Sequence, residues 1–308
     1  MWEISPLLFD IIQVVLEDVC LMISSKNGIL CICWLITTIG LANISEDPAI
    51  QKATKYYIDG DYHQAVTEYK RFLFFHPGHP EKSLIYLQMG KVFIQLADFG
   101  SAIDLLQVAF QQTNDVAQKL QIGFQLIPVL IAENQTDRAV IFSYRVLTLI
   151  DRSSTNVRSD DRARIYFFLG ISELYRQNWK AAKAAFLISD LVSPEAITLL
   201  DELGKEDVKK SASMAKWLST FCPGLGQFYA GEWADGINSF LLNGIIASYV
   251  SHLFSSGRRQ SAILLGSSIL WRYYNGNRQN AVKAVGQYNT RLNEKKINRV
   301  LDQLSLKK

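Results

Sequence analysis

Residues 166–186 read YFFLGISELYRQNWKAAKAAF, and they hold the clearest structural signal of the chain. Gly170 and Ala182 are small residues twelve positions apart, and Gln177-Asn178-Trp179 lies between them as a turn. Small residues at two facing positions allow two antiparallel helices to approach each other closely. The stretch therefore predicts a helical hairpin that ends before Pro194.

The same separation of twelve recurs three times upstream, in the pairs Ala53 and Ala65, Gly90 and Ala102, and Ile127 and Ala139. The units follow one another after 37, 37 and 43 residues. Large residues flank each pair, as in the tetratricopeptide repeat (TPR) of about 34 residues. Residues 49–200 therefore resemble the TPR family. The resemblance implies an all-α solenoid of about four helical hairpins over residues 43–204, with a concave groove that holds a protein or peptide segment.

The first helices of a TPR domain line this groove, which assigns candidate binding positions in the two best copies. They are Lys91, Ile94, Gln95, Arg164, Phe167, Ile171 and Tyr175. The set lacks the basic cluster with which some repeat proteins hold a terminal carboxylate, so we expect no such clamp. Phe167 and Tyr175 are equally consistent with packing residues of the core, and both alternatives stay open at this point.

A second motif, PGLGQFYAG, occupies residues 223–231, after a polar linker over residues 205–216. The uncharged run Gly236–Phe254 follows it and is close to the ~20 residues that span a bilayer. The motif resembles a family of small bacterial membrane hairpin domains marked by P-G-L-G-Q-x-Y-x-G. The matching residues are Pro223, Gly224, Gly226, Gln227, Tyr229 and Gly231. The resemblance implies a small transmembrane helical hairpin over residues 217–278 and a membrane location, without an activity.

The chain after this hairpin is strongly basic, with a net charge of +9 from Ser255 onward. Residues 279–308 have helical periodicity, which predicts a basic amphipathic tail helix that binds anionic lipid headgroups. No nucleic-acid module is recognisable, so we expect no nucleic-acid partner. The positive-inside rule favours a single crossing by Gly236–Phe254, whereas the hairpin resemblance favours two crossings, and both remain open.

The N-terminal leader, residues 1–42, contains a second apolar run. Lys26 precedes an apolar centre that ends in Gly40-Leu41-Ala42, a pattern typical of a signal peptide over about residues 22–42 that is cut after Ala42. An uncleaved anchor is the alternative. The acidic stretch before Met22 leaves the start codon open between Met1 and Met22. A cut leader would place the repeats in the periplasm, at the inner membrane of a bacterial cell envelope.

The composition and the motifs exclude several classes of protein. Hydrophobic residues make up 49% and charged residues 20%, so the chain is not intrinsically disordered. The four cysteines have no metal-ligand spacing, and His76 and His79 fit a loop between repeats. We found no motif of a catalytic, metal or cofactor site and expect none, so we do not expect an enzyme. The sequence predicts a membrane-tethered TPR scaffold of the envelope. The first alternative is an envelope assembly or transport factor that acts through PGLGQFYAG, and a weaker one is a cytoplasmic adaptor.

Overall fold

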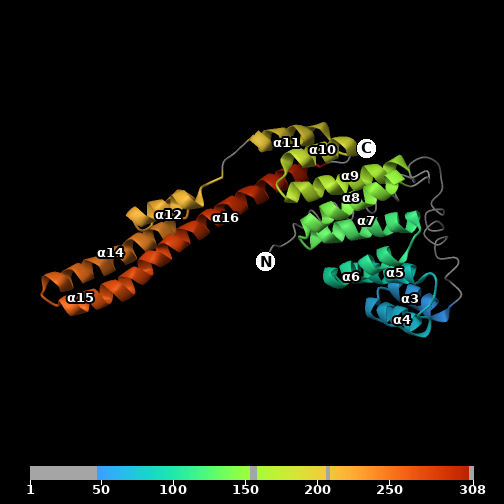
Figure 1. Cartoon of the computed structure of the whole chain (residues 1–308), viewed down its shortest axis with the longest axis horizontal. Coiled ribbons are helices and arrows are strands. Elements are labelled where there is room, and N and C mark those ends of the chain that lie inside the picture. The colour runs from blue at the N-terminus through green and yellow to red at the C-terminus, as the bar shows by residue number, and fades with distance from the viewer. Residues whose placement is uncertain (1–46, 153–157, 206–208, 305–308) are drawn as a thin grey trace. The chain divides into compact units, whose positions relative to one another are not determined.

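The computed structural model describes residues 47–152, 158–205 and 209–304, and all elements formed by these residues are helices (Figure 1). The chain divides into two compact units. Of the described residues, the first unit holds those up to Glu202 together with residues 300–304, and the second unit holds those of Leu203–Arg299. The predicted signal peptide and its cleavage site after Ala42 lie outside the described residues.

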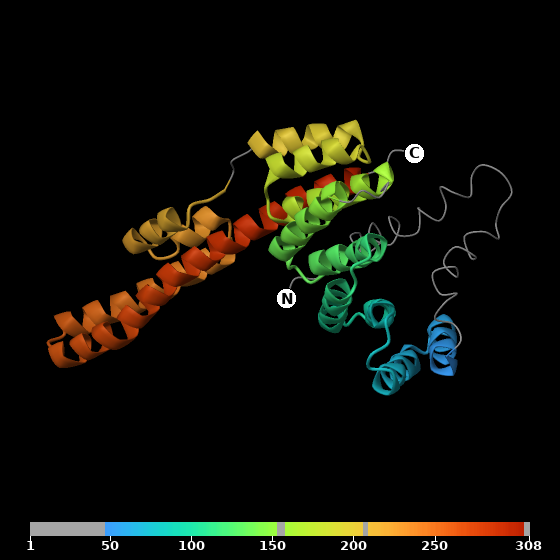
Figure 2. The same ribbon diagram turned by 45° about the vertical axis from the view of Figure 1, so that its right-hand side comes forward.

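The first unit contains four helical hairpins, which confirms the predicted repeats. The views in Figure 1 and Figure 2 both show them stacked in chain order. The pairs are α3 (Pro48–Ile58) with α4 (Tyr62–Phe75), α5 (Lys82–Gln95) with α6 (Phe99–Gln112), α7 (Val116–Ala132) with α8 (Thr136–Arg152), and α9 (Ser159–Tyr175) with α10 (Trp179–Ser189). Helix α11 (Pro194–Lys205) follows them. The first unit therefore has a TPR-type fold.

The residues separated by twelve lie where the two helices of each hairpin meet. Six of them have an exposed fraction of 0%: Ala53, Ala65, Ala102, Ile127, Ala139 and Ala182. A Cβ atom at Gly90 would lie 2.8 Å from the Leu106 side chain, and one at Gly170 would lie 2.5 Å from the Phe186 ring. The small residues of the repeat therefore allow close helix contact, as the sequence predicts.

Each turn between the paired helices is built in the same way. One residue has a left-handed backbone, and it is Gly60, Ala97, Asn134 or Gln177, with φ between 55° and 80°. In three hairpins the next residue is an Asp or Asn whose side chain caps the second helix. Asp98, for example, accepts a hydrogen bond from the backbone N–H of Ser101 at 3.1 Å. The cap is visible in the sequence, whereas the left-handed residue is obvious only where it is glycine.

Ala97 is a test of this turn because its φ of 55° disfavours a side chain. The left-handed conformation costs alanine about 1–2 kcal/mol, and the larger entropy loss of glycine offsets about half of that. We expect Ala97→Gly to raise the free energy of unfolding by about 0.5–1 kcal/mol. Thermal unfolding followed by circular dichroism measures it. Gly60→Ala (φ 80°) is the reciprocal control and should destabilise; a destabilised Ala97→Gly would contradict the turn geometry.

The second unit is built around an antiparallel hairpin of long helices. Its helices are α12 (Ala212–Phe221), α13 (Leu225–Ala230), α14 (Trp233–Ser255), α15 (Arg259–Leu265), the π-helix η1 (Gly266–Leu270) and α16 (Trp271–Gln303). The chain reverses at Gly257, which has a φ of 80°, and α15 and η1 then contact α14. α16 continues in the same direction, and its residues from Val300 belong to the first unit.

This course of α16 corrects the predicted tail. The helix passes residue 279 without interruption, so residues 279–308 do not begin a separate helix. Ala281 and Val285 are 0% exposed in the core of the second unit, and Val300 is also 0% exposed. The apolar face that we predicted to lie on lipid is therefore covered by protein. In the first unit, the Ser193 hydroxyl donates a hydrogen bond to the Gln303 carbonyl at 3.0 Å.

Candidate functional site

The candidate partner-binding surface is formed by the first helices of the hairpins. Helix α5 contacts α7, and α7 contacts α9, so these first helices lie next to one another. Lys91 and Ile94 on α5 are half-buried, and Gln95 is exposed. Burial lowers the pKa of the Lys91 ammonium group, because removal from water disfavours its charged form.

Arg164 on α9 is the most distinctive residue of this surface. Its guanidinium carbon lies 4.2 Å from the centre of the Phe124 ring on α7, a cation–π contact. Its buried Nε atom has no hydrogen-bond partner among the described residues. Burial lowers the pKa of Arg164, since the nearby Asp161 only partly offsets the loss of water. A positioned donor thus lacks an acceptor.

Two of the predicted groove residues lie in the core instead of on the binding surface. Phe167 is 1% exposed and Ile171 is 2% exposed, so both belong to the core and offer no surface to a partner. The Phe167 ring lies 5.8 Å from that of Phe186, between centres, and the packing alternative left open for Phe167 is therefore correct. Tyr175 stays half-buried, and burial raises its pKa to about 12.

Phe124 is a residue of this site that the sequence analysis missed, and its ring is largely buried, with an exposed fraction of 9%. It lies three positions before Ile127, just as Phe167 lies three positions before Gly170. The repeat register could therefore have indicated it. Phe167 and Phe124 occupy the same place in successive units, but only Phe124 has an arginine stacked on its ring.

The PGLGQFYAG motif shapes the junction between α12, α13 and α16. Gly224 (φ 99°) and Gly231 (φ 93°) adopt left-handed conformations at the two ends of α13. Pro223 is half-buried in the turn that ends α12. A Cβ atom at Gly226 would lie 2.3 Å from the Ala215 carbonyl oxygen and 2.6 Å from the Ala281 Cβ. Only glycine allows the three helices to meet here.

Gln227 joins the same helices by hydrogen bonds and is 1% exposed. Its Nε2 donates to the Asn277 Oδ1 at 2.8 Å, and its Oε1 accepts from the Ser219 hydroxyl at 3.4 Å. The backbone N–H of Gly224 also donates to the Asn277 Oδ1, at 3.2 Å. Ser219 and Asn277 are the partners that the motif alone did not reveal.

Tyr229 closes this junction on the side of the linker. Its hydroxyl oxygen accepts a hydrogen bond from the backbone N–H of Ser211 at 3.1 Å. The Asn289 amide forms two hydrogen bonds of 2.9 Å with the Lys210 backbone, and the Lys210 Nζ lies 3.7 Å from the centre of the Tyr288 ring. Each polar residue of the motif therefore has a structural partner inside the unit.

Helix α14 presents a broad apolar surface. It is the one helix in the described part of the chain that is long and apolar enough to cross a membrane. Large apolar side chains stand exposed on it, including Ile245 at 66% and Phe240 at 52%. Trp217 and Phe221 on α12 are exposed as well, with ring centres 4.3 Å apart. A helix in the core of a soluble protein would bury such residues.

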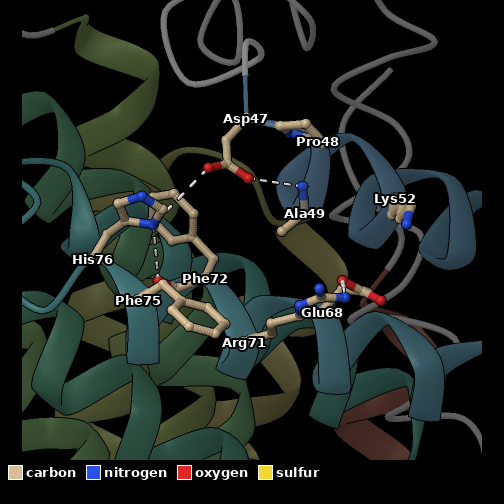
Figure 3. Close-up of a pocket in the computed structure, with 9 residues that line it drawn as sticks. All are labelled: Asp47, Pro48, Ala49, Lys52, Glu68, Arg71, Phe72, Phe75 and His76. Carbon is tan, nitrogen blue, oxygen red and sulfur yellow. Dashed lines mark hydrogen bonds and ion pairs between the residues drawn. The ribbon is translucent and has the colours of Figure 1, made fainter.

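A pocket of 230 Å³ lies in the first hairpin, between the start of α3 and the end of α4 (Figure 3). Two pairs of its charged or titratable side chains lie close together, and in one of them the Arg71 Nη1 lies 3.8 Å from the Glu68 Oε2. Asp47 caps α3 by accepting from the Ala49 N–H at 2.7 Å, and it lies 3.9 Å from the His76 Nδ1. His76 and His79 both contact the Phe72 ring. Within residues 47–152, 158–205 and 209–304 no group of metal-ligating side chains was found.

The comparisons with known proteins give only distant likenesses. No family model matches the chain, and no curated protein matches it. The apo form of RapI is 12% identical, with a TM-score of 0.43, over 76% of this chain and 75% of that one. A tetratricopeptide repeat protein from Parabacteroides merdae is 14% identical, with a TM-score of 0.42, over 82% and 97%. A Rap protein complexed with competence and sporulation factor is 14% identical, with a TM-score of 0.36, over 82% and 75%. The TPR-type fold assigned above rests on the hairpins themselves.

Proposed function

We propose that this chain is a membrane-tethered TPR adaptor whose first helices bind a protein or peptide segment. One observation carries the proposal: Arg164 is held over Phe124, and its buried Nε lacks an acceptor. A buried donor without a partner is unfavourable, so a bound segment that supplies an acceptor gains free energy there.

The chemistry of this surface indicates what such a segment carries. Arg164 offers donors to a carboxylate or carbonyl oxygen. Lys91 is a second cation, and its lowered pKa would rise again beside a carboxylate. Gln95 adds an exposed amide. We therefore expect an acidic segment rather than a purely apolar one, and the absence of a basic cluster argues against recognition of a chain terminus alone.

The membrane part of the proposal is supported by α14. Its uncharged run and its exposed apolar side chains fit a lipid environment. The signal-peptide pattern of residues 22–42 supports export of the repeats, which would place them in the periplasm at the inner membrane of a bacterial envelope. The alternative function, an assembly or transport factor acting through the PGLGQFYAG unit, is favoured by a polar trough in that unit, described below.

The adaptor function is tested by the partner that co-purifies with the full chain from detergent extracts. We expect Arg164→Ala to reduce the recovery of that partner by about tenfold or more, since a hydrogen bond to a charged group contributes about 1.5–3 kcal/mol. The matched control is Lys180→Ala, an exposed cation on the second helix α10, which should retain the partner. Equal recovery of the partner by both variants would show that the partner does not bind to the first helices.

Topology gives a separate test of the membrane tether. The Gly226 backbone lies against Ala281, so the chain entering and leaving the α14–α16 hairpin comes together, which supports two crossings rather than one. In a chain whose native cysteines are replaced, we expect an impermeant maleimide to label Asp302→Cys and Asp104→Cys alike in intact cells. Ser256→Cys at the hairpin tip should be protected. Labelling at 104 with protection at 302 would indicate a single crossing.

A further inference from the structure

A polar trough of about 1100 Å³ runs along the hairpin of the second unit. Helix α14 forms one wall, with Asp235 and Asn238. The other wall extends from Ile269 in η1 to Gln287 in α16, about 27 Å at a rise of 1.5 Å per residue. The trough is therefore long, and it is open to the outside.

Amide side chains dominate the walls, among them Asn238, Asn275, Gln279, Asn280 and Gln287. Each amide offers both donors and an acceptor, as every peptide group does. The trough thus presents the complement of a polypeptide main chain along its length, which a metal ion or an apolar ligand would not use.

One amide of the trough is incompletely bonded. Asn243 is 5% exposed, and its Nδ2 donates to the Ser239 carbonyl of its own helix at 2.8 Å. Its buried Oδ1 has no hydrogen-bond partner among the described residues. The neighbouring Gln227 and Asn277, by contrast, bond to each other. A buried acceptor without a donor is unfavourable, so an occupant of the trough would supply one.

Small residues leave room for a main chain to approach. Ser239, Gly276 and Ala284 line the trough, and a Cβ atom at Gly276 would meet nothing within 4 Å. The charged residues then favour one kind of segment. Arg272 and Lys283 lie on the α16 wall, and Asp235 is the one carboxylate among the lining residues, so the trough favours an acidic chain.

We propose that this trough binds an extended, acidic polypeptide segment of a partner through its main chain. A single phosphate or lipid headgroup does not fit, because Arg272 and Lys283 are about 16 Å apart along α16. A second copy of this chain that docks through its own trough does not fit either, since two concave surfaces leave a gap between them. The binding role stands on the second unit alone and is independent of the repeat groove.

The membrane placement proposed above gives the trough an added consequence. Two contacts show which parts of α14 and of the returning chain lie side by side. Gly266 lies against Val250, and Gln227 bridges Ser239 and Asn277. Arg272 lies between Gly266 and Asn277, and so it is level with the middle of α14. Ionisable residues at bilayer depth face protein or water rather than lipid. The trough would then hold a polar segment beside the hydrocarbon, as an assembly or transport factor requires.

The test uses the full chain in phospholipid nanodiscs. The probe is a fluorescein-labelled peptide of repeated Glu-Ser-Gly, and fluorescence anisotropy measures its affinity. Gly276→Leu fills the trough. Gly286→Leu is the matched control, because it lies on the same helix, also has nothing within 4 Å of its Cβ position, and does not line the trough. We expect Gly276→Leu to weaken binding by about tenfold, and Gly286→Leu to remain near the wild-type value.

Two further variants separate the possible outcomes. Asn243→Leu removes the unpartnered acceptor and should also weaken binding, while thermal unfolding shows that the variant stays folded. Arg164 lies in the repeat groove, so Arg164→Ala should leave the affinity of the peptide for the trough unchanged. The proposal is overturned if the wild type does not bind the peptide, if Gly276→Leu and Gly286→Leu bind equally, or if only Arg164→Ala loses binding. The last result would instead assign the peptide to the repeats.

Discussion

Replacing Gly226 by alanine should strongly disrupt the packing of the second unit. The new Cβ would lie 2.3 Å from the Ala215 carbonyl oxygen and 2.6 Å from the Ala281 Cβ. The first contact is with backbone, which cannot rotate away as a side chain can, so α13 must move away from α12 and α16. Overpacking of this kind costs about 1–3 kcal/mol and occasionally more. We expect the upper end of that range, about 3 kcal/mol.

Hydrogen–deuterium exchange of the full chain in detergent measures this effect where it arises. Peptides from α12, α13 and the middle of α16 should exchange faster in Gly226→Ala, because the hydrogen bonds of Gln227 with Asn277 and Ser219 open with the junction. Gly244→Ala is the control: it lies within α14 and has nothing within 4 Å of its Cβ position. Unchanged exchange rates in Gly226→Ala would show that α12, α13 and α16 pack less tightly around residue 226 than these distances indicate.

Gly170→Leu should have the corresponding effect in the first unit. Its Cβ alone would lie 2.5 Å from the Phe186 ring. Phe186 is 1% exposed and contacts Phe167, so its ring has no free space into which to move. Hairpin α9–α10 must open, and we expect a loss of about 1–3 kcal/mol in the free energy of unfolding.

Thermal unfolding by circular dichroism and exchange of the α9 and α10 peptides together measure the Gly170→Leu effect. Gly78→Leu is the matched control, because Gly78 lies in a loop and has nothing within 4 Å of its Cβ position. The exchange data also separate the two units: Gly170→Leu should loosen α9 and α10, and Gly226→Ala should loosen α12 and α13. If Gly78→Leu destabilised the chain as much as Gly170→Leu, close helix contact would not be the cause.

The repeats could be predicted because their signal is local and recurs. A pair such as Gly90 and Ala102 lies within one hairpin, and the same separation appears four times. Even the repeat that has the large Ile127 in place of a small residue forms its hairpin, and Ile127 and Ala139 are both 0% exposed there. The groove was harder to predict. Phe167 and Arg164 are close in sequence, but α10 covers the first with Phe186, while α7 offers Phe124 to the second.

The hairpins of the first unit and their register follow from the local sequence pattern, because short-range packing and backbone geometry specify both. Three features became clear only from the fold: which candidate side chains are buried, that residues 279–303 continue one long helix, and that Gln227 bonds to Asn277. The physical reason is distance along the chain. Gln227 and Asn277 are separated by 50 residues, and Ser193 and Gln303 by 110. Such contacts depend on how whole helices pack, which no local pattern records.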